Sequence, residues 1–183
     1  MKTIKHKPIQ AIGIGGMPAS GKTTLVKNIR KKLKKPKMFR FGVLRGEYYT
    51  DENLYILGVY GKGLFDGTDK LSMSVQPDAV SFFKKISETT VLFEGDRLFN
   101  LSFIEAIRNL TELKLYYLDV KDTTLAVRHF DRNDTQTDKF KKGRKTKYEN
   151  ILNNCSDIVV LNNQTEKDLN QNIETIWHDL EKK

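Results

Sequence analysis

Short apolar runs alternate along the chain with segments in which apolar residues recur every three or four positions. The runs lack strict alternation, which is typical of parallel strands buried on both faces. They predict strands at residues 8–14, 89–96, 112–120 and 156–163. The periodic segments predict helices at residues 22–35, 77–86, 102–110, 123–130, 146–154 and 165–183. Strands that alternate with helices indicate an α/β fold, a parallel sheet flanked by helices.

Local signals predict several of the boundaries of these elements. Pro36 ends the first helix, and Pro77 is expected as the first residue of the second. Thr165 and Asp168 have the spacing of a capping box at the start of the last helix.

One stretch departs from the strand–helix alternation. Residues 38–60 are rich in aromatic and β-branched residues around a turn-like centre, which predicts a β-hairpin. We therefore expect one domain over residues 1–183, with a hairpin insertion at 39–62 and a basic lid at 128–147.

Size and composition exclude several classes of protein. The chain has 183 residues, of which 38% are hydrophobic and 30% charged, so it is neither a disordered tail nor a coiled coil. No apolar run reaches the roughly 18–20 residues of a membrane span, so no membrane partner is expected. Cys155 is the only cysteine, which excludes an internal disulfide and a thiolate zinc cluster.

The net charge of +9 is concentrated in two windows. Residues 27–37 carry seven basic residues and residues 139–147 carry six, and neither window contains an acid. Outside these windows acids outnumber bases by four. This asymmetry favours a polyanionic partner, although a run of charges is also what a solvated helix face shows.

The strongest motif follows the first predicted strand and opens the first predicted helix. It has the form G-x-x-x-x-G-K-[ST], in which backbone N–H groups, a helix N-terminus and a lysine hold phosphates. We expect these residues to bind a nucleoside triphosphate: Gly16, Met17, Pro18, Ala19, Ser20, Gly21, Lys22, Thr23 and Thr24. Lys22 is expected at the β- and γ-phosphates, and the Thr23 hydroxyl on Mg²⁺. The absence of an Asn-Lys-x-Asp motif argues against a GTPase, and the short chain favours a kinase.

Phosphoryl transfer to a hydroxyl also needs an acid near Mg²⁺, a base and further cations. Glu94 and Asp96 end a predicted strand and are the candidates near the metal, with Arg97 beside a phosphate or the acceptor. Asp69 lies in a second polar loop and is a candidate to orient or deprotonate the acceptor. Asp69 and Asp96 both stay candidates for the base.

Two arginines precede the second basic window. Arg128 and Arg132 lie four residues apart and therefore share one helix face. Such a pair would suit a lid that closes on the transferring phosphate, and it would equally suit a solvated face beside Asp131 and Asp134. Tyrosines in the predicted hairpin are candidates to stack on a base, or simply strand core: Tyr48, Tyr49, Tyr55 and Tyr60.

Four segments together resemble a family of bacteriophage P-loop kinases that act on modified thymine bases in DNA. They are GMPASGKTT at 16–24, GTDKLSM at 67–73, FEGDRLFN at 93–100, and Gln136 followed by KFKKGRKTK at 139–147. The first is common to all P-loop proteins, while the second and third are more specific. Members of this family phosphorylate the hydroxymethyl group of 5-hydroxymethyluracil within DNA, a first step towards hypermodified bases.

The resemblance implies ATP as donor, Mg²⁺ as metal and the cytoplasm of an infected bacterium as location. A DNA substrate would account for both basic windows, and its base would have to be flipped out of the duplex. The residues expected to grip DNA are Lys141, Lys142, Arg144, Lys145 and Lys147.

Two alternatives stand beside this hypothesis. One is a P-loop kinase of free nucleosides or nucleotides, which needs a lid with a few arginines but no lysine-rich strip. The other is a nucleotide-gated DNA-binding module without transfer chemistry, against which stand the three acids Asp69, Glu94 and Asp96.

Overall fold

The computed structural model describes residues 8–61, 66–133 and 137–182, and its contacts divide the chain into two compact units. The first unit contains the chain through Gly13 together with Leu33–Lys114. The second unit contains Ile14–Lys32 and the chain from Leu115 onward. Strand β1 (Ile9–Gly16) runs through both units, so each is described in turn.

The sheet of the first unit has the order β2-β3-β4-β5-β1. Strands β2 (Lys37–Phe41), β3 (Leu44–Tyr49) and β4 (Leu54–Leu57) form an antiparallel meander, and β4 pairs in parallel with β5 (Thr90–Glu94). All five residues of β5 are buried, as expected of a central strand.

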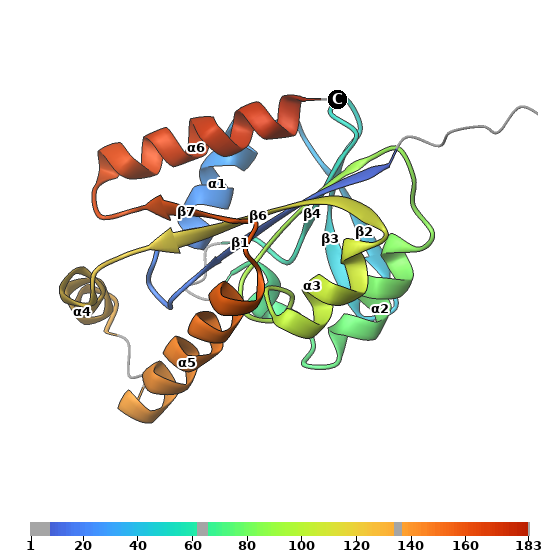
Figure 1. The fold of residues 1–183 in the computed structure, drawn as a ribbon. Helices are drawn as coiled ribbons and strands as arrows, with labels where there is room; N and C mark the ends of the chain where they lie inside the picture. Colours follow the sequence, from blue (N-terminus) through green and yellow to red (C-terminus); the bar gives the residue numbers. More distant parts are fainter. Residues whose placement is uncertain (1–7, 62–65, 134–136, 183) are drawn as a thin grey trace, which may run out of the picture. The chain divides into compact units, whose positions relative to one another are not determined.

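Helices α2 (Val75–Phe83) and α3 (Leu101–Arg108) of this unit pack side by side on one face of the sheet (Figure 1). Aromatic rings fill the space beneath them, and Phe82 stacks on Phe39 with the ring centroids 5.2 Å apart. Helix α3 begins after Asn100, whose side chain accepts the N–H of Phe103 at 3.0 Å and so satisfies one free donor of the first turn.

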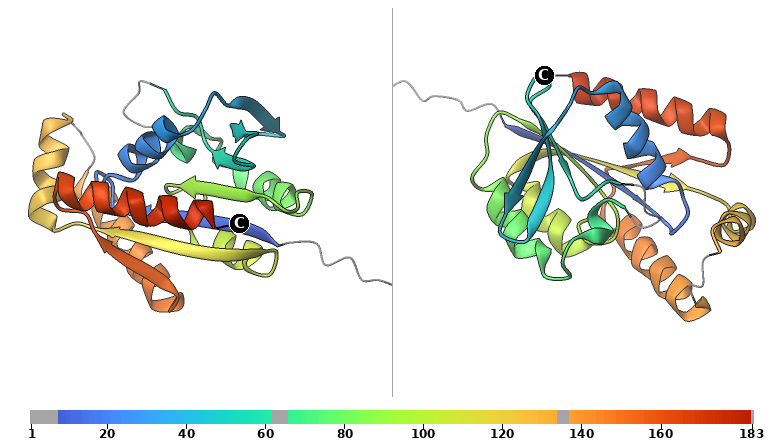
Figure 2. Two further views of the ribbon diagram at one scale, coloured as in Figure 1. Left: turned by 90° about the horizontal axis from the view of Figure 1, so that it is seen from above. Right: turned by 180° about the vertical axis from the view of Figure 1, so that it is seen from behind.

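The second unit has the strand order β1-β6-β7, with β6 (Thr111–Asp119) parallel to β7 (Ile158–Asn162). Helices α1 (Lys22–Lys32) and α6 (Glu166–Glu181) cover one face, and α5 (Asp138–Asn154) lies against the other (Figures 1 and 2). Adjacent residues of a strand point to opposite faces. Accordingly Tyr116 donates its hydroxyl proton to Asp179 of α6, while the ring of Tyr117 lies 5.6 Å from that of Tyr148 in α5.

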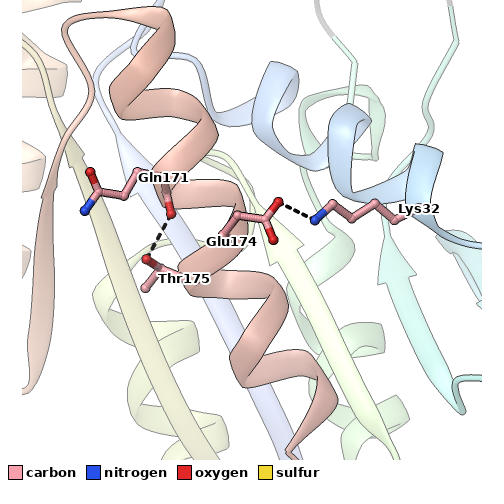
Figure 3. A network of polar contacts seen from close by, with 4 residues as sticks. All are labelled: Lys32, Gln171, Glu174 and Thr175. Atoms are coloured by element: carbon pink, nitrogen blue, oxygen red, sulfur yellow. Dashed lines mark hydrogen bonds and ion pairs between the residues drawn. The ribbon is translucent and has the colours of Figure 1, made fainter.

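Helix α6 is also attached to α1 by a surface ion pair. The ammonium of Lys32 lies 2.5 Å from a carboxylate oxygen of Glu174 and 5.2 Å from the centre of the Trp177 ring. Next to Glu174 on α6, the Thr175 hydroxyl donates to the carbonyl oxygen of Gln171 (Figure 3). Both groups of the ion pair are partly exposed, so it contributes little to stability, and the buried face of α6 contributes most of it.

These elements confirm the predicted α/β fold with helices flanking a mostly parallel sheet, and they correct two boundaries. Helix α2 begins at Val75, so Pro77 is its third residue rather than its first. A proline is tolerated there because the first N–H groups of a helix have no intrahelical partner. The helix predicted at 146–154 begins earlier, at Asp138, so the basic window 139–147 lies within α5, which Thr137 caps by accepting the N–H of Phe140.

The proposed division into one domain, a hairpin insertion and a lid stays a prediction. The meander β2–β4 covers most of residues 39–62, and helix α4 (Asp122–Asp131) opens the predicted lid. Gln136 and Asp134 lie outside the described residues. None of the described helices is long and apolar enough to cross a membrane.

The predicted capping box at the start of α6 is present. The Thr165 hydroxyl accepts the N–H of Asp168 at 3.1 Å, and the Asp168 carboxylate accepts the N–H of Thr165 at 2.8 Å. The bond from the N–H of Thr165 is the main cause that lowers the pKa of Asp168, because it stabilises the charged carboxylate.

We expect Thr165→Ala to lower the free energy of unfolding by about 1 kcal/mol, because the first turn loses its cap. The matched control is Thr175→Ala in the same helix, which removes a hydroxyl from an exposed interior position and introduces a better helix former. Urea unfolding measures both variants. Equal stability losses in the two would contradict a capping role for Thr165.

Candidate functional site

The phosphate-binding motif of the second unit forms the turn between β1 and α1. The chain takes positive φ angles at Gly16, Ala19 and Gly21, which folds it into a tight loop. A Cβ at Gly16 would lie 2.5 Å from the Ser20 hydroxyl and 3.0 Å from the carbonyl oxygen of Leu118, so only glycine fits. Ala19 anchors the outside of the loop against Val120 and Leu125.

Lys22 bends back over this loop. Its buried ammonium donates to the carbonyl oxygens of Gly16 at 2.7 Å and Met17 at 3.0 Å. The ammonium is therefore held at the loop by backbone carbonyl groups. Such a lysine can turn towards an added phosphate by exchanging these carbonyls for phosphate oxygens.

The loop also has the donors that a triphosphate needs. The Ser20 hydroxyl is fully buried and has no hydrogen-bond partner among the described residues. The N–H of Leu25 makes the first intrahelical bond, to the carbonyl oxygen of Gly21, so the earlier N–H groups of α1 lie outside the helical hydrogen-bond ladder. These groups fit the phosphates of ATP, and Thr23, half-buried in the same turn, is the residue expected on Mg²⁺.

Arg128 of α4 reaches the same loop. Its two terminal nitrogens donate to four carbonyl oxygens: those of Ala19 and Ser20, each at 3.3 Å, and those of Asn163 at 2.9 Å and Gln164 at 3.0 Å. Burial, and secondarily the charge of Arg132, lowers the pKa of Arg128. Arg132 itself is exposed at the end of the helix, and its role at a phosphate stays a prediction.

The predicted acids lie together in the first unit. A 3-10 turn, η1 (Thr68–Lys70), packs against the end of β5, and the Thr68 hydroxyl donates to the carbonyl oxygen of Glu94. A Cβ at Gly67 would lie 1.9 Å from a carboxylate oxygen of Glu94, and one at Gly95 would lie 3.2 Å from a carboxylate oxygen of Asp69. Two glycines thus allow the segments GTDKLSM and FEGDRLFN to meet.

The side chains of this cluster differ in accessibility. Glu94 is buried, Asp96 is half-buried and Asp69 is exposed. A catalytic base must reach the hydroxyl that it deprotonates, so its carboxylate has to be accessible. Asp69 and Asp96 therefore fit the role of base better than Glu94. The predicted place of Glu94 at the metal stays a prediction.

Two cations border the acids. Lys70 forms an ion pair with buried Asp66 at 2.5 Å, and Asp66 also accepts the N–H of Gly61 at 3.0 Å. The guanidinium of Arg97 donates to the carbonyl oxygen of Leu71 at 3.4 Å, which links the loop after β5 to the loop after η1. The sequence does not single out Asp66, because nothing in its spacing marks it, and it gives Thr68 only as part of the segment GTDKLSM.

The hairpin tyrosines serve mainly as core. Tyr48 stacks on Tyr55 with the ring centroids 4.3 Å apart, and Tyr55 meets the edge of Phe82 at 5.1 Å. Tyr49 is buried and donates its hydroxyl proton to Glu47 at 2.8 Å. Of the two alternatives, strand core and a platform for a base, the structure favours strand core for these three.

The predicted DNA-gripping residues lie on α5 in the second unit. Lys142 and Lys145 are exposed, and Lys145 lies 3.4 Å from Asp122 in a solvated pair. The guanidinium of Arg144 lies 4.6 Å from the ring centre of Phe140. An open hollow of about 440 Å³ beside them is lined by Thr137, Lys139, Phe140, Gly143 and Arg144.

A family model described as P-loop Nucleotide Kinase3 matches residues 6–181. The chain belongs to this family. Membership in P-loop Nucleotide Kinase3 establishes a phosphotransferase of the P-loop kinase type, and such kinases generally use ATP with Mg²⁺. It does not define the acceptor.

Two solved structures are similar to this P-loop Nucleotide Kinase3 protein. A gluconokinase from Sinorhizobium meliloti 1021 is 13% identical, with a TM-score of 0.46, and the match covers 93% of this chain and 97% of that one. A shikimate kinase from Bacteroides thetaiotaomicron is 14% identical, with a TM-score of 0.49, and the match covers 94% and 98%. No protein with a curated description matches the chain significantly.

We expect Lys22→Ala to lower the rate of phosphoryl transfer by at least about a hundredfold, because the loop loses its charge at the phosphates. The fold should persist, since the Lys22 ammonium donates to carbonyls of its own loop. Lys31→Ala on the exposed face of α1 is the matched control. A Lys22→Ala enzyme with full activity would exclude this loop as the phosphate site.

Single replacements distinguish the two candidate bases. The variant that removes the base should lower kcat by about 10²–10⁴-fold with little change in MgATP affinity. We expect this of Asp69→Asn, and we expect Asp96→Asn to raise the Mg²⁺ concentration needed for half-maximal rate. Asp51→Asn, at an exposed surface pair with Lys34, is the control. Unchanged kcat and Mg²⁺ dependence in both variants would remove the two aspartates from the mechanism.

Proposed function

We propose that the protein transfers the γ-phosphoryl group of ATP to the hydroxymethyl group of 5-hydroxymethyluracil in DNA. The reaction forms a bond between the hydroxymethyl oxygen and the γ-phosphorus and breaks the bond between that phosphorus and the β,γ-bridging oxygen. ADP leaves, and the hydroxyl proton passes to a carboxylate.

The residues of the chain divide this work between them. ATP with Mg²⁺ supplies the phosphoryl group and neutralises part of its charge. Lys22 and the N–H groups that open α1 hold the phosphates. Asp69 or Asp96 accepts the proton of the acceptor hydroxyl. Arg97, and Arg132 of the predicted lid, supply positive charge at the phosphates or the acceptor.

The basic face of α5 is the main observation that supports DNA as the acceptor. From Lys139 to Tyr148 the helix contains six basic residues and no acid, and most of these side chains reach solvent. Asp122, the carboxylate beside Lys145, is itself largely exposed and neutralises little of this charge. A kinase of small molecules has no need of such a surface, whereas a nucleic-acid backbone binds it with release of counterions.

Phe140 and Arg144 add a second element to this surface. Aromatic rings and guanidinium groups are the side chains on which unpaired bases stack. The hollow beside them offers an accessible ring in the middle of a basic surface. This arrangement suits a strand in which at least one base is unstacked, as flipping of the target base requires.

Phosphorylation of a free nucleoside or nucleotide is the second candidate. The description of the family, a nucleotide kinase, favours it. The third alternative, a DNA-binding module without transfer chemistry, conflicts with membership in a kinase family.

The deciding experiment offers the protein γ-labelled ATP, Mg²⁺ and a panel of acceptors. The panel is DNA containing 5-hydroxymethyluracil, matched unmodified DNA, and the free hydroxymethyl nucleoside with its monophosphate. We expect label on the modified DNA alone. Label on the nucleoside or the monophosphate, with none on DNA, would contradict the proposal and establish the second candidate.

A fourfold variant tests the role of α5 in DNA binding. Replacing Lys141, Lys142, Arg144 and Lys145 by alanine should weaken DNA binding. The slope of log affinity against log salt concentration should become shallower by about 0.9 for each phosphate that is no longer neutralised. The control removes four exposed lysines elsewhere: Lys31, Lys84, Lys121 and Lys167. Anisotropy of labelled DNA over a range of salt measures both. Equal effects in the two variants would show that only net charge matters.

A further inference from the structure

The carbonyl oxygen of Ser20, inside the phosphate loop, accepts two side-chain hydrogen bonds from residues distant in sequence. The amide nitrogen of Asn163 donates to it at 2.7 Å, and a guanidinium nitrogen of Arg128 donates at 3.3 Å. All three residues belong to the second unit. Asn163 follows β7 and is 1% exposed, so its amide has no water to bond instead.

A trans peptide group directs its C=O and N–H in opposite directions. Two donors on the Ser20 oxygen therefore hold the N–H of Gly21 pointing away from Asn163 and Arg128. A phosphate loop works only when its N–H groups face the phosphates and its carbonyls face elsewhere. We propose that Asn163, assisted by Arg128, is a positioning residue that fixes the Ser20–Gly21 peptide in the phosphate-binding orientation.

Asn163 is itself held firmly. Its side-chain oxygen accepts from the amide of Asn172 in α6 at 3.1 Å, and its backbone N–H donates to the carbonyl oxygen of Asp119 at 2.9 Å. These bonds leave its NH₂ group directed at the loop. The approach is so close that a Cβ at Gly21 would lie 2.7 Å from that nitrogen. The second glycine of the motif is therefore required in this chain by Asn163.

Arg128 supports the same peptide from another side. It donates to the carbonyl oxygens of Ala19 and Ser20 in the loop, and to those of Asn163 and Gln164 after β7. The guanidinium group of Arg128 thus connects the phosphate loop to the segment after β7, the same two segments that Asn163 connects. In this arrangement Arg128 acts on nucleotide binding through the loop, rather than by closing over the transferring phosphate.

This inference rests on membership in the kinase family and is independent of the acceptor. Asn163→Asp tests it, because the shape is kept while the donor to Ser20 becomes an acceptor. Two ligands are titrated by calorimetry with Mg²⁺, namely ATP and inorganic tripolyphosphate, which has no base. We expect both affinities to fall by the same factor, about ten- to a hundredfold. Asn170→Asp, exposed on α6, is the control and should change neither.

Two results would overturn the proposal. A loss of ATP affinity with unchanged tripolyphosphate affinity would mean that Asn163 reads the base. Unchanged affinity for both ligands would mean that the bond to Ser20 has no effect on phosphate binding. If circular dichroism shows that Asn163→Asp does not fold, Arg128→Lys is tested in its place. Lysine keeps the positive charge but lacks the planar set of donors of the guanidinium group. Arg128→Lys should weaken both ligands by a smaller common factor, and unchanged binding would again contradict the role.

Discussion

The orientation of the backbone in the loop after β1 is the constraint on which the rest of the molecule depends. Peptide groups in a tight loop expose either carbonyls or N–H groups, and only the second choice attracts a polyphosphate. Positive φ at Gly16, Ala19 and Gly21 makes the required turn, and Asn163 and Arg128 hold one carbonyl outward. The last strand and helices α4 and α6 thus support the loop.

The acids that the sequence singles out lie in the first unit. Gly67 and Gly95 let the η1 turn and the end of β5 approach closely, with Thr68 bonded to the Glu94 carbonyl. Glu94 is buried at this junction, while Asp69 is exposed and Asp96 is half-buried.

The sequence predicted what depends on local pattern. The strands, the phosphate motif and the capping box of Thr165 follow from spacing alone, and the structure contains all of them. Asn163 was missed because its role depends on a contact with Ser20, which lies 143 residues away in sequence. The first half of α5 was not predicted because its run of lysines, interrupted by Gly143, lacks the apolar period of a helix. The predicted second half contains the buried Tyr148 and Ile151. The sequence left the hairpin tyrosines as either a base-stacking surface or strand core, and it could not show the contact of Tyr55 with Phe82.

The central claim is that the loop after β1 holds the phosphates of a nucleoside triphosphate. Calorimetric titration of the full chain with ATP, ADP and AMP in the presence of Mg²⁺ tests it most directly. Because Lys22 and the N–H groups of the loop act on the β- and γ-phosphates, affinity should fall steeply from ATP to AMP. Equal affinity for ATP and AMP would show that the nucleotide is held by its base or ribose, and would contradict the account.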